Sequence, residues 1–247
     1  RSAPQRGHLD HLKRICGCLV KMSDFKIRFR THEPDCSDVK GPEQDWFSVH
    51  GNVKESLPHD APKPLGKPVQ LTHHVDANLM HNITTSCSVM ACLHFVNGTL
   101  IDWHSKKQAT VETTTYGSEF VAARTCVEQI IDPQTTLLHL GVNINPKSHM
   151  FGDNESVVNS STNLYAKLIE RHNMSSFHCV CEAIASGFMD FSCSLGKFNP
   201  ADILTKPCAG GIQFEKQVKV AMGIVPEGFD SPEILKARRV VRSASRS

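Results

Sequence analysis

The sequence predicts an α/β fold in which a mixed five-stranded sheet carries helices on both faces. Two observations support this class. First, apolar and polar residues alternate over three neighbouring segments, two of which are joined by Asn97-Gly98, a pair typical of type I′ hairpin turns. Second, segments with helical spacing then alternate with short strand-like runs, which gives a mixed sheet. The five predicted strands are residues 69–76, 88–96, 99–106, 149–151 and 188–195.

The part before the sheet has a different character. Residues 8–21 have the spacing of an amphipathic helix, and residues 26–30 alternate charged and apolar side chains as a strand does. Between residues 32 and 68 there are six prolines and few apolar runs, which predicts a linker or long loop.

Helices are predicted between and after the later strands. The first contains Glu119 and carries a long apolar stripe; Pro133 is expected to break it, and it should finish before Gly141. Another begins at Glu155, and a longer one at residues 166–186 is stopped by Gly187. A short helix is expected within residues 214–222, and disorder from Ser231 onward. The stripe consists of Tyr116, Phe120, Ala123, Val127, Ile130 and Ile131.

Apolar content, cysteine number and net charge limit the classes of protein to which the chain can belong. Apolar residues make up 40% of the chain and no apolar run has the length of a membrane span, so we expect a soluble protein without a membrane partner. The ten cysteines are expected to be mostly reduced, because the chain is neither short nor visibly secreted. A net charge of +2 is too small to indicate nucleic-acid binding by itself. Local basic spots such as Lys106-Lys107 mean that it does not exclude a duplex ligand either.

Four acidic residues occupy positions where a sheet can gather them. Asp76 and Asp153 each end a predicted strand, Glu119 lies in the first turns of a helix, and Asp202 lies at a helix start. Carboxylates are the ligands of Mg²⁺, and two such ions can clamp the attacking and leaving oxygens in phosphodiester hydrolysis. Each acid also has a simpler interpretation as a helix cap or an exposed helix residue.

The acids belong to four short blocks that follow one another in the order Asp, Glu, Asp, Asp. With these blocks the chain resembles, over residues 69–206, the ribonuclease H domain of copia-type long-terminal-repeat retrotransposon polyproteins. The blocks are the strand Leu71-Thr72-His73-His74-Val75-Asp76, Ser105-Lys106-Lys107-Gln108 leading to Ser118-Glu119-Phe120, Gly152-Asp153-Asn154-Glu155-Ser156, and Ala201-Asp202-Ile203-Leu204-Thr205-Lys206.

The resemblance implies a function and a site. It implies an endonuclease that cuts the RNA strand of RNA-DNA hybrids, with Asp76, Glu119, Asp153 and Asp202 as catalytic acids that hold two Mg²⁺ or Mn²⁺ ions. Asp202 is expected to be the mobile fourth ligand. Amides and hydroxyls near the acids are candidates for contacts to sugar or phosphate, although they also fit turns and caps. These candidates are Asn78, Gln108, Ser118 and Asn154.

The resemblance also implies a context. Residues 1–31 look like the end of a reverse transcriptase, residues 32–68 a linker, residues 69–208 the ribonuclease H-like domain, and residues 209–247 a partly disordered extension. The chain would then be the C-terminal piece of a polyprotein, with the upstream reverse transcriptase as a partner. Cytoplasmic virus-like particles are the first expected location and the nucleus the second.

Other functions were weighed. At Cys179, Cys181 and Cys208 the chain departs from the family pattern, which leaves a second hypothesis, an inactive remnant that at most binds nucleic acid. Zinc is not predicted for His172, His178 and the nearby cysteines, because the chain has no Cys-x-x-Cys pair. An integrase would carry its glutamate last, and a polymerase would need a Tyr-x-Asp-Asp turn; the chain has neither feature.

Overall fold

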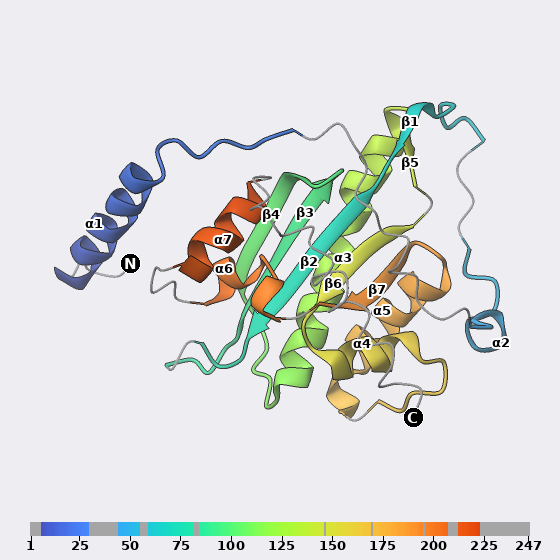
Figure 1. Cartoon of the computed structure of the whole chain (residues 1–247). Coiled ribbons are helices and arrows are strands. Elements are labelled where there is room, and N and C mark those ends of the chain that lie inside the picture. Colours follow the sequence, from blue (N-terminus) through green and yellow to red (C-terminus); the bar gives the residue numbers. More distant parts are fainter. Residues whose placement is uncertain are drawn as a thin grey trace.

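A five-stranded mixed sheet forms the centre of the protein in the computed structural model, with the strand order β4-β3-β2-β6-β7 (Figure 1). Strands β2, β3 and β4 are antiparallel, whereas β6 and β7 run parallel to β2. This confirms the predicted class. The strands are β2 Leu71–Asn78, β3 Val89–Val96, β4 Thr99–Lys107, β6 Ser148–Gly152 and β7 Met189–Cys193. The structure describes residues 6–29, 44–54, 59–81, 84–145, 147–168, 170–194, 196–206 and 212–222.

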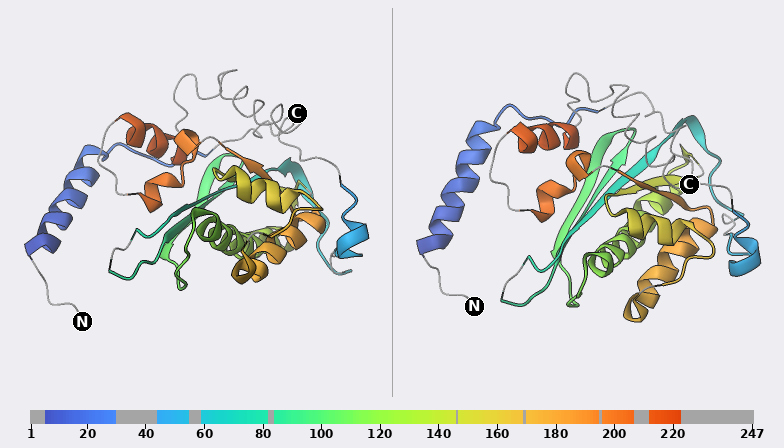
Figure 2. Two further views of the ribbon diagram at one scale, coloured as in Figure 1. Left: turned by 90° about the horizontal axis from the view of Figure 1, so that it is seen from below. Right: turned by 60° about the horizontal axis from the view of Figure 1, so that its bottom comes forward.

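Helices cover both faces of the sheet, as predicted (Figure 2). The larger apolar core lies under the first group of helices and includes Val75, Phe120, Met150 and Val180, all of them buried. A smaller cluster around Leu93 packs against the second group. The first group is α3 Thr115–His139, α4 Glu155–Thr162 and α5 Met174–Ala185, and the second is α6 Asp202–Thr205 and α7 Ile212–Ala221.

The hairpin between β3 and β4 has the predicted turn. Asn97 has a φ of 49° and Gly98 a φ of 72°, so both central residues are left-handed, as a type I′ turn requires. The turn fixes the register in which Val96 faces Thr99, and it therefore sets which residues of β4 lie beside the core strand.

Helix α3 differs from the prediction at its proline. It continues through Pro133 to His139, and Gly141, with a φ of 73°, follows it. The residues beyond the proline are held by tertiary contacts, since Gln134 is buried and accepts a hydrogen bond from the Ser148 hydroxyl at 3.2 Å. Such packing outweighs the backbone hydrogen bond that proline removes.

The helix predicted at residues 166–186 is shorter than expected. Residues 166–168 are irregular, a 3₁₀ turn spans Arg171–Asn173, and α5 begins only at Met174. In this stretch the Asn173 side-chain amide donates to Glu170 Oε2 at 2.9 Å, across the 3₁₀ turn. The predicted stop is correct, because Gly187 has a φ of 78° just beyond the helix.

The N-terminal part is only half as predicted. Helix α1, Arg6–Lys21, is present and buries none of its residues. The strand expected at residues 26–30 is wrong over the part that the structure describes, residues 26–29. Instead of pairing with a strand, Arg28 donates its backbone N–H to the Met222 carbonyl at 3.1 Å, at the end of α7.

The predicted linker contains regular elements. Helix α2, Phe47–His50, lies within residues 32–68, and strand β1, Leu65–Val69, begins there and ends one residue beyond; β1 pairs in parallel with β5, Val142–Ile144. The short 3₁₀ turn Gly196–Phe198 precedes α6. The predicted tail from residue 231 lies outside the described residues. None of the described helices combines the length and the apolar character that a membrane crossing requires.

The hairpin turn generates a stability prediction. Gly98→Ala places a β-carbon in the left-handed region and should lower the free energy of unfolding by about 1 kcal/mol. Asn97→Gly should change the free energy of unfolding by much less, because glycine tolerates the same backbone conformation. Urea unfolding of both variants and the parent measures the difference, and equal midpoints for Gly98→Ala and the parent would contradict the turn assignment.

Candidate metal centre

Three of the four predicted acids converge at one edge of the sheet. One carboxylate oxygen from each of Asp76, Glu119 and Asp153 lies within 4.8 Å of the other two. Asp76 lies near the end of β2 and Asp153 directly after β6, and these parallel neighbours end at the same edge. Glu119 reaches them from the second turn of α3, where its Oε1 accepts the Ala77 backbone N–H at 3.3 Å.

The fourth acid, Asp202, lies beside this group rather than in it. It is the first residue of α6, and its Oδ1 contacts the Nζ of Lys206, which also lies 3.6 Å from Asp76 Oδ1. Gln217 donates to the other oxygen of Asp202 at 3.4 Å. The structure thus connects Asp202 to the three-acid group through one ammonium group.

Buried polar contacts hold α6 against β2. Asn199 is fully buried; its amide donates to the Val75 carbonyl at 2.8 Å and accepts the Ala201 N–H at 3.1 Å. The Thr205 hydroxyl donates to Asp76 Oδ2. Because Asn199 and Thr205 lie on either side of Asp202, these bonds fix the start and the end of the short helix that carries it.

The acids line an open pocket of about 520 Å³. Two of the predicted nucleic-acid contacts, Asn78 and Asn154, also line it. Asn154 caps α4 by accepting the Val157 N–H at 3.2 Å, and Asn78 donates to the Thr205 carbonyl at 3.2 Å. The full lining is Asp76, Ala77, Asn78, Leu79, Thr115, Glu119, Asp153, Asn154, Glu155 and Lys206.

The other two predicted contacts are corrected by the structure. Gln108 is 1% exposed and Ser118 is fully buried. Gln108 donates its side-chain amide to the Ser118 carbonyl at 2.7 Å, so it ties the chain after β4 to the first turn of α3. Neither side chain can reach a sugar or phosphate from the interior. The sequence shows their polarity but not their burial.

Burial disfavours ionisation of these acids when no cation is bound. It raises the pKa of Asp76 to about 6 from an ordinary 3.8, although the Thr205 hydrogen bond and the Lys206 ammonium lower it. Burial and the charges of Asp76 and Asp153 raise the pKa of Glu119 well above 4.5. The pKa of Asp153 is also raised by burial. A divalent ion would reverse each of these effects.

Lys206 was missed as a site residue, together with Thr205. Both stand in the Ala201–Lys206 block, three and four residues after Asp202, a spacing that puts them on the same side of a helical turn as that acid. Burial lowers the pKa of Lys206, but its hydrogen bond to Asp202 and the nearby carboxylates raise it overall. Among the described residues, Lys206 is the one lysine or arginine within 4.0 Å of the acids.

The donor set fits a hard divalent cation. The ligand atoms are all carboxylate oxygens, the pocket is open enough to admit water, and the Lys206 ammonium lies 3.6 Å from Asp76 Oδ1. Mg²⁺ and Mn²⁺ take oxygen ligands of this kind and keep several waters. Asp76, Glu119 and Asp153 would hold the ion.

Comparison with known proteins gives structural neighbours only. No protein-family model and no curated protein matches the chain. LC11-RNase H1 from compost, solved with an RNA/DNA hybrid, is 16% identical, with 55% of this chain and 93% of that chain covered and a TM-score of 0.44. The N-terminal RNase H domain of a Mycobacterium tuberculosis protein is 13% identical, with coverages of 56% and 91% and a TM-score of 0.41.

A larger neighbour is the foamy viral protease-reverse transcriptase, also solved with an RNA/DNA hybrid. It is 15% identical, 62% of this chain and 22% of that chain are covered, and the TM-score is 0.39.

The raised pKa of Asp76 generates a prediction about stability. A carboxyl whose pKa is higher in the folded chain stabilises the fold below about pH 4, and that contribution is lost as the pH rises through about 6. With a chelator at about pH 7.5, Asp76→Asn should therefore be more stable than the parent, by on the order of 2 kcal/mol. The difference should vanish near pH 4.

Thermal unfolding of both proteins, with and without Mg²⁺, measures this effect. Mg²⁺ should raise the melting temperature of the parent more than that of Asp76→Asn. Asp132→Asn, at an exposed position of α3, serves as the control. An Asp76→Asn variant less stable than the parent in chelator at neutral pH would contradict the account.

Proposed function

We propose that the chain is a metal-dependent endonuclease of the ribonuclease H type that hydrolyses the RNA strand of RNA-DNA hybrids. The observation that carries the proposal is the convergence of Asp76, Glu119 and Asp153, from two strands and a helix, in one open pocket. These acids, with Asp202, stand in the four blocks that resemble copia-type ribonuclease H domains. Geometry and sequence order therefore support the same site.

Asp76, Glu119, Asp153 and Asp202 would hold two Mg²⁺ or Mn²⁺ ions. Bound there, the ions supply a nucleophilic water and neutralise charge on the leaving oxygen and the phosphate. Other residues of the chain position these acids: Thr205 orients Asp76, the Ala77 N–H orients Glu119, and Asn199 fixes the helix of Asp202. Lys206 neutralises part of the carboxylate charge before metal and substrate arrive.

The substrate class follows from the resemblance and from the rim of the pocket. Asn78 and Asn154 lie beside the acids with polar side chains that can bond to sugar hydroxyls or phosphate oxygens. The 2′-hydroxyl is the group that lets a protein distinguish RNA from DNA. These two residues are the proposed contacts to the strand that is cut.

The proposed context is a retrotransposon polyprotein. The upstream reverse transcriptase would be the partner, in cytoplasmic virus-like particles or in the nucleus. Helix α1 supports a contact with such a partner, because it exposes an apolar stripe and buries none of its residues. The exposed residues of the stripe are Leu9, Leu12, Ile15 and Leu19, at 52–66%.

An inactive remnant is the alternative. The departures at Cys179 and Cys181 favour it, yet both residues lie in α5 and neither lines the acidic pocket. Cys181 is buried and directs its thiol to the Ser161 carbonyl in the core. The structure therefore places these two departures in the packing of α5, whereas the acids themselves are retained. Residue 208 lies outside the described residues.

Cleavage of a labelled RNA-DNA hybrid with Mg²⁺ or Mn²⁺ tests the proposal. Asp76→Asn and Glu119→Gln should each lower the rate more than about a hundredfold, because each removes a charged ligand from a site whose ions do the chemistry. Asp132→Asn, on the exposed face of α3, should leave the rate unchanged. Cutting should be confined to the RNA strand and should stop with chelator.

Two results would overturn the proposal that the chain is a nuclease. One is a folded parent chain that binds the hybrid equally with and without metal and does not cut it, which is the behaviour of the remnant. The other is cutting that persists in both site variants, which would place the activity elsewhere or in a contaminant.

A further inference from the structure

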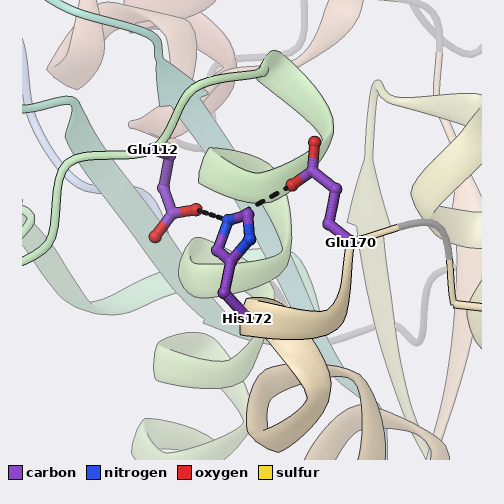
Figure 3. Close-up of side chains that lie close together, drawn as sticks. All are labelled: Glu112, Glu170 and His172. Carbon is purple, nitrogen blue, oxygen red and sulfur yellow. Dashed lines mark hydrogen bonds and ion pairs between the residues drawn. The ribbon is translucent and has the colours of Figure 1, made fainter.

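A second group of potential metal ligands lies on the other side of the start of α3. One ligand atom from each of Glu112, Glu170 and His172 lies within 4.8 Å of the other two. Figure 3 shows the imidazole of His172 between the two carboxylates. Glu112 precedes α3, whereas Glu170 and His172 come from the segment before α5. No residue of this group lines the acidic pocket.

A fourth polar atom completes the group. The side-chain nitrogen of Asn173, a buried residue, lies 3.3 Å from Glu112 Oε2, 2.9 Å from Glu170 Oε2 and 3.3 Å from His172 Nε2. His172 Nε2 is itself 3.1 Å from Glu112 Oε2 and 3.5 Å from Glu170 Oε2. The two hydrogens of the amide go to Glu112 and Glu170, and His172 donates to Glu112 Oε2 when Nε2 carries the proton.

These distances are close to the dimensions of a tetrahedral zinc site. Zinc binds nitrogen and carboxylate oxygen at about 2.0–2.2 Å, so ligand atoms at the corners of a tetrahedron are separated by about 3.3–3.5 Å. Of the five separations, three are 3.3–3.5 Å, and the other two, 2.9 and 3.1 Å, are shorter. Turning the Asn173 amide over would present its oxygen, which is a metal ligand, in place of its nitrogen.

The carboxylates are oriented by a second set of contacts. The Thr110 hydroxyl donates to Glu112 Oε1 at 2.9 Å, and the Thr114 hydroxyl donates to Glu170 Oε1. The outer oxygens are thereby occupied, and the Oε2 atoms face the common centre. Hydrogen bonds of this kind, from outside the ligand set, orient the ligands of metal sites and raise their affinity.

Little positive charge lies near the two carboxylates of the centre. Glu112 has a side-chain exposure of 4% and Glu170 of 13%. Over the described part of the chain, His172 is the sole basic side chain within 4.0 Å of either carboxylate. Buried carboxylates are stable only when compensated.

Gly117 leaves room for the group, because a β-carbon there would lie 2.6–2.8 Å from Asn173 Nδ2, Glu112 Oε2 and Glu170 Oε2.

We propose that Glu112, Glu170 and His172, with the Asn173 amide oxygen, form a tetrahedral site for Zn²⁺. The mixed set of one imidazole and three oxygens suits zinc better than Mg²⁺, which prefers six oxygens. The ion joins the loop before α3 to the segment before α5 and so fixes the start of the helix that carries Glu119. Its role is structural, and it does not depend on the nuclease proposal.

Zinc titration in competition with a chromophoric chelator tests the site. The full chain should first carry Asp76→Asn and Asp153→Asn, so that the acidic pocket no longer competes for the ion. This protein should bind one Zn²⁺ per chain, and Co²⁺ in its place should give the intense visible absorption of a tetrahedral nitrogen-oxygen site. Adding His172→Ala should weaken zinc at least tenfold. His178→Ala, at another exposed histidine of the same region, should not.

His172 is exposed, with 53% of its side chain accessible, so its truncation does not open the core. Glu170→Gln, which keeps the side chain's size, provides a second variant with the same expected loss. The proposal is overturned if His172→Ala binds zinc as tightly as its parent, if Co²⁺ shows thiolate charge-transfer bands, or if no zinc binds at about tenfold molar excess. In the last case the four residues form a hydrogen-bonded anchor only.

Discussion

Asp76 is buried at the carboxyl end of β2, and two further carboxylates are placed against it by β6 and α3. Burial of these three carboxyl groups is the main cause of the raised pKa values of Asp76, Glu119 and Asp153, and neighbouring carboxylates add to it. The surrounding fold maintains the arrangement through directed bonds from Thr205, Ala77 and Asn199. A divalent ion would compensate the negative charge of this arrangement.

Helix α3 links the parts of the molecule that matter for function. Its second turn supplies Glu119 to the acidic pocket, while Gly117 in its first turn lies against the group of Glu112, Glu170 and His172. Gln108, which was expected to contact nucleic acid, ties the end of β4 to this same turn. Three sets of polar contacts therefore fix the start of one helix, and the position of Glu119 depends on all of them.

The sequence was sufficient for features that depend on local pattern. The Asn97-Gly98 turn, the five strands and the glycine beyond α5 follow from residue type and spacing. Features that depend on tertiary contact were not accessible. Alternation at residues 26–29 does not show whether a partner strand exists, and Pro133 does not show that Gln134 is anchored beyond it. The three converging acids were predicted because they stand in the ordered blocks that resemble ribonuclease H domains, and two of them end predicted strands. His172 was weighed with cysteines, whereas its partners are Glu170, two residues before it, and Glu112, which is distant in sequence.

The central claim is that the acidic pocket is a metal centre, and the most direct test is to locate the metal. Crystals of the full chain grown with Mn²⁺ allow anomalous scattering to place the ion without reference to activity. The account predicts anomalous density bound by Asp76, Glu119 and Asp153, with the Lys206 ammonium displaced from Asp76. Ordered carboxylates with Lys206 still between Asp76 and Asp202, and no manganese beside them at saturating metal, would contradict it.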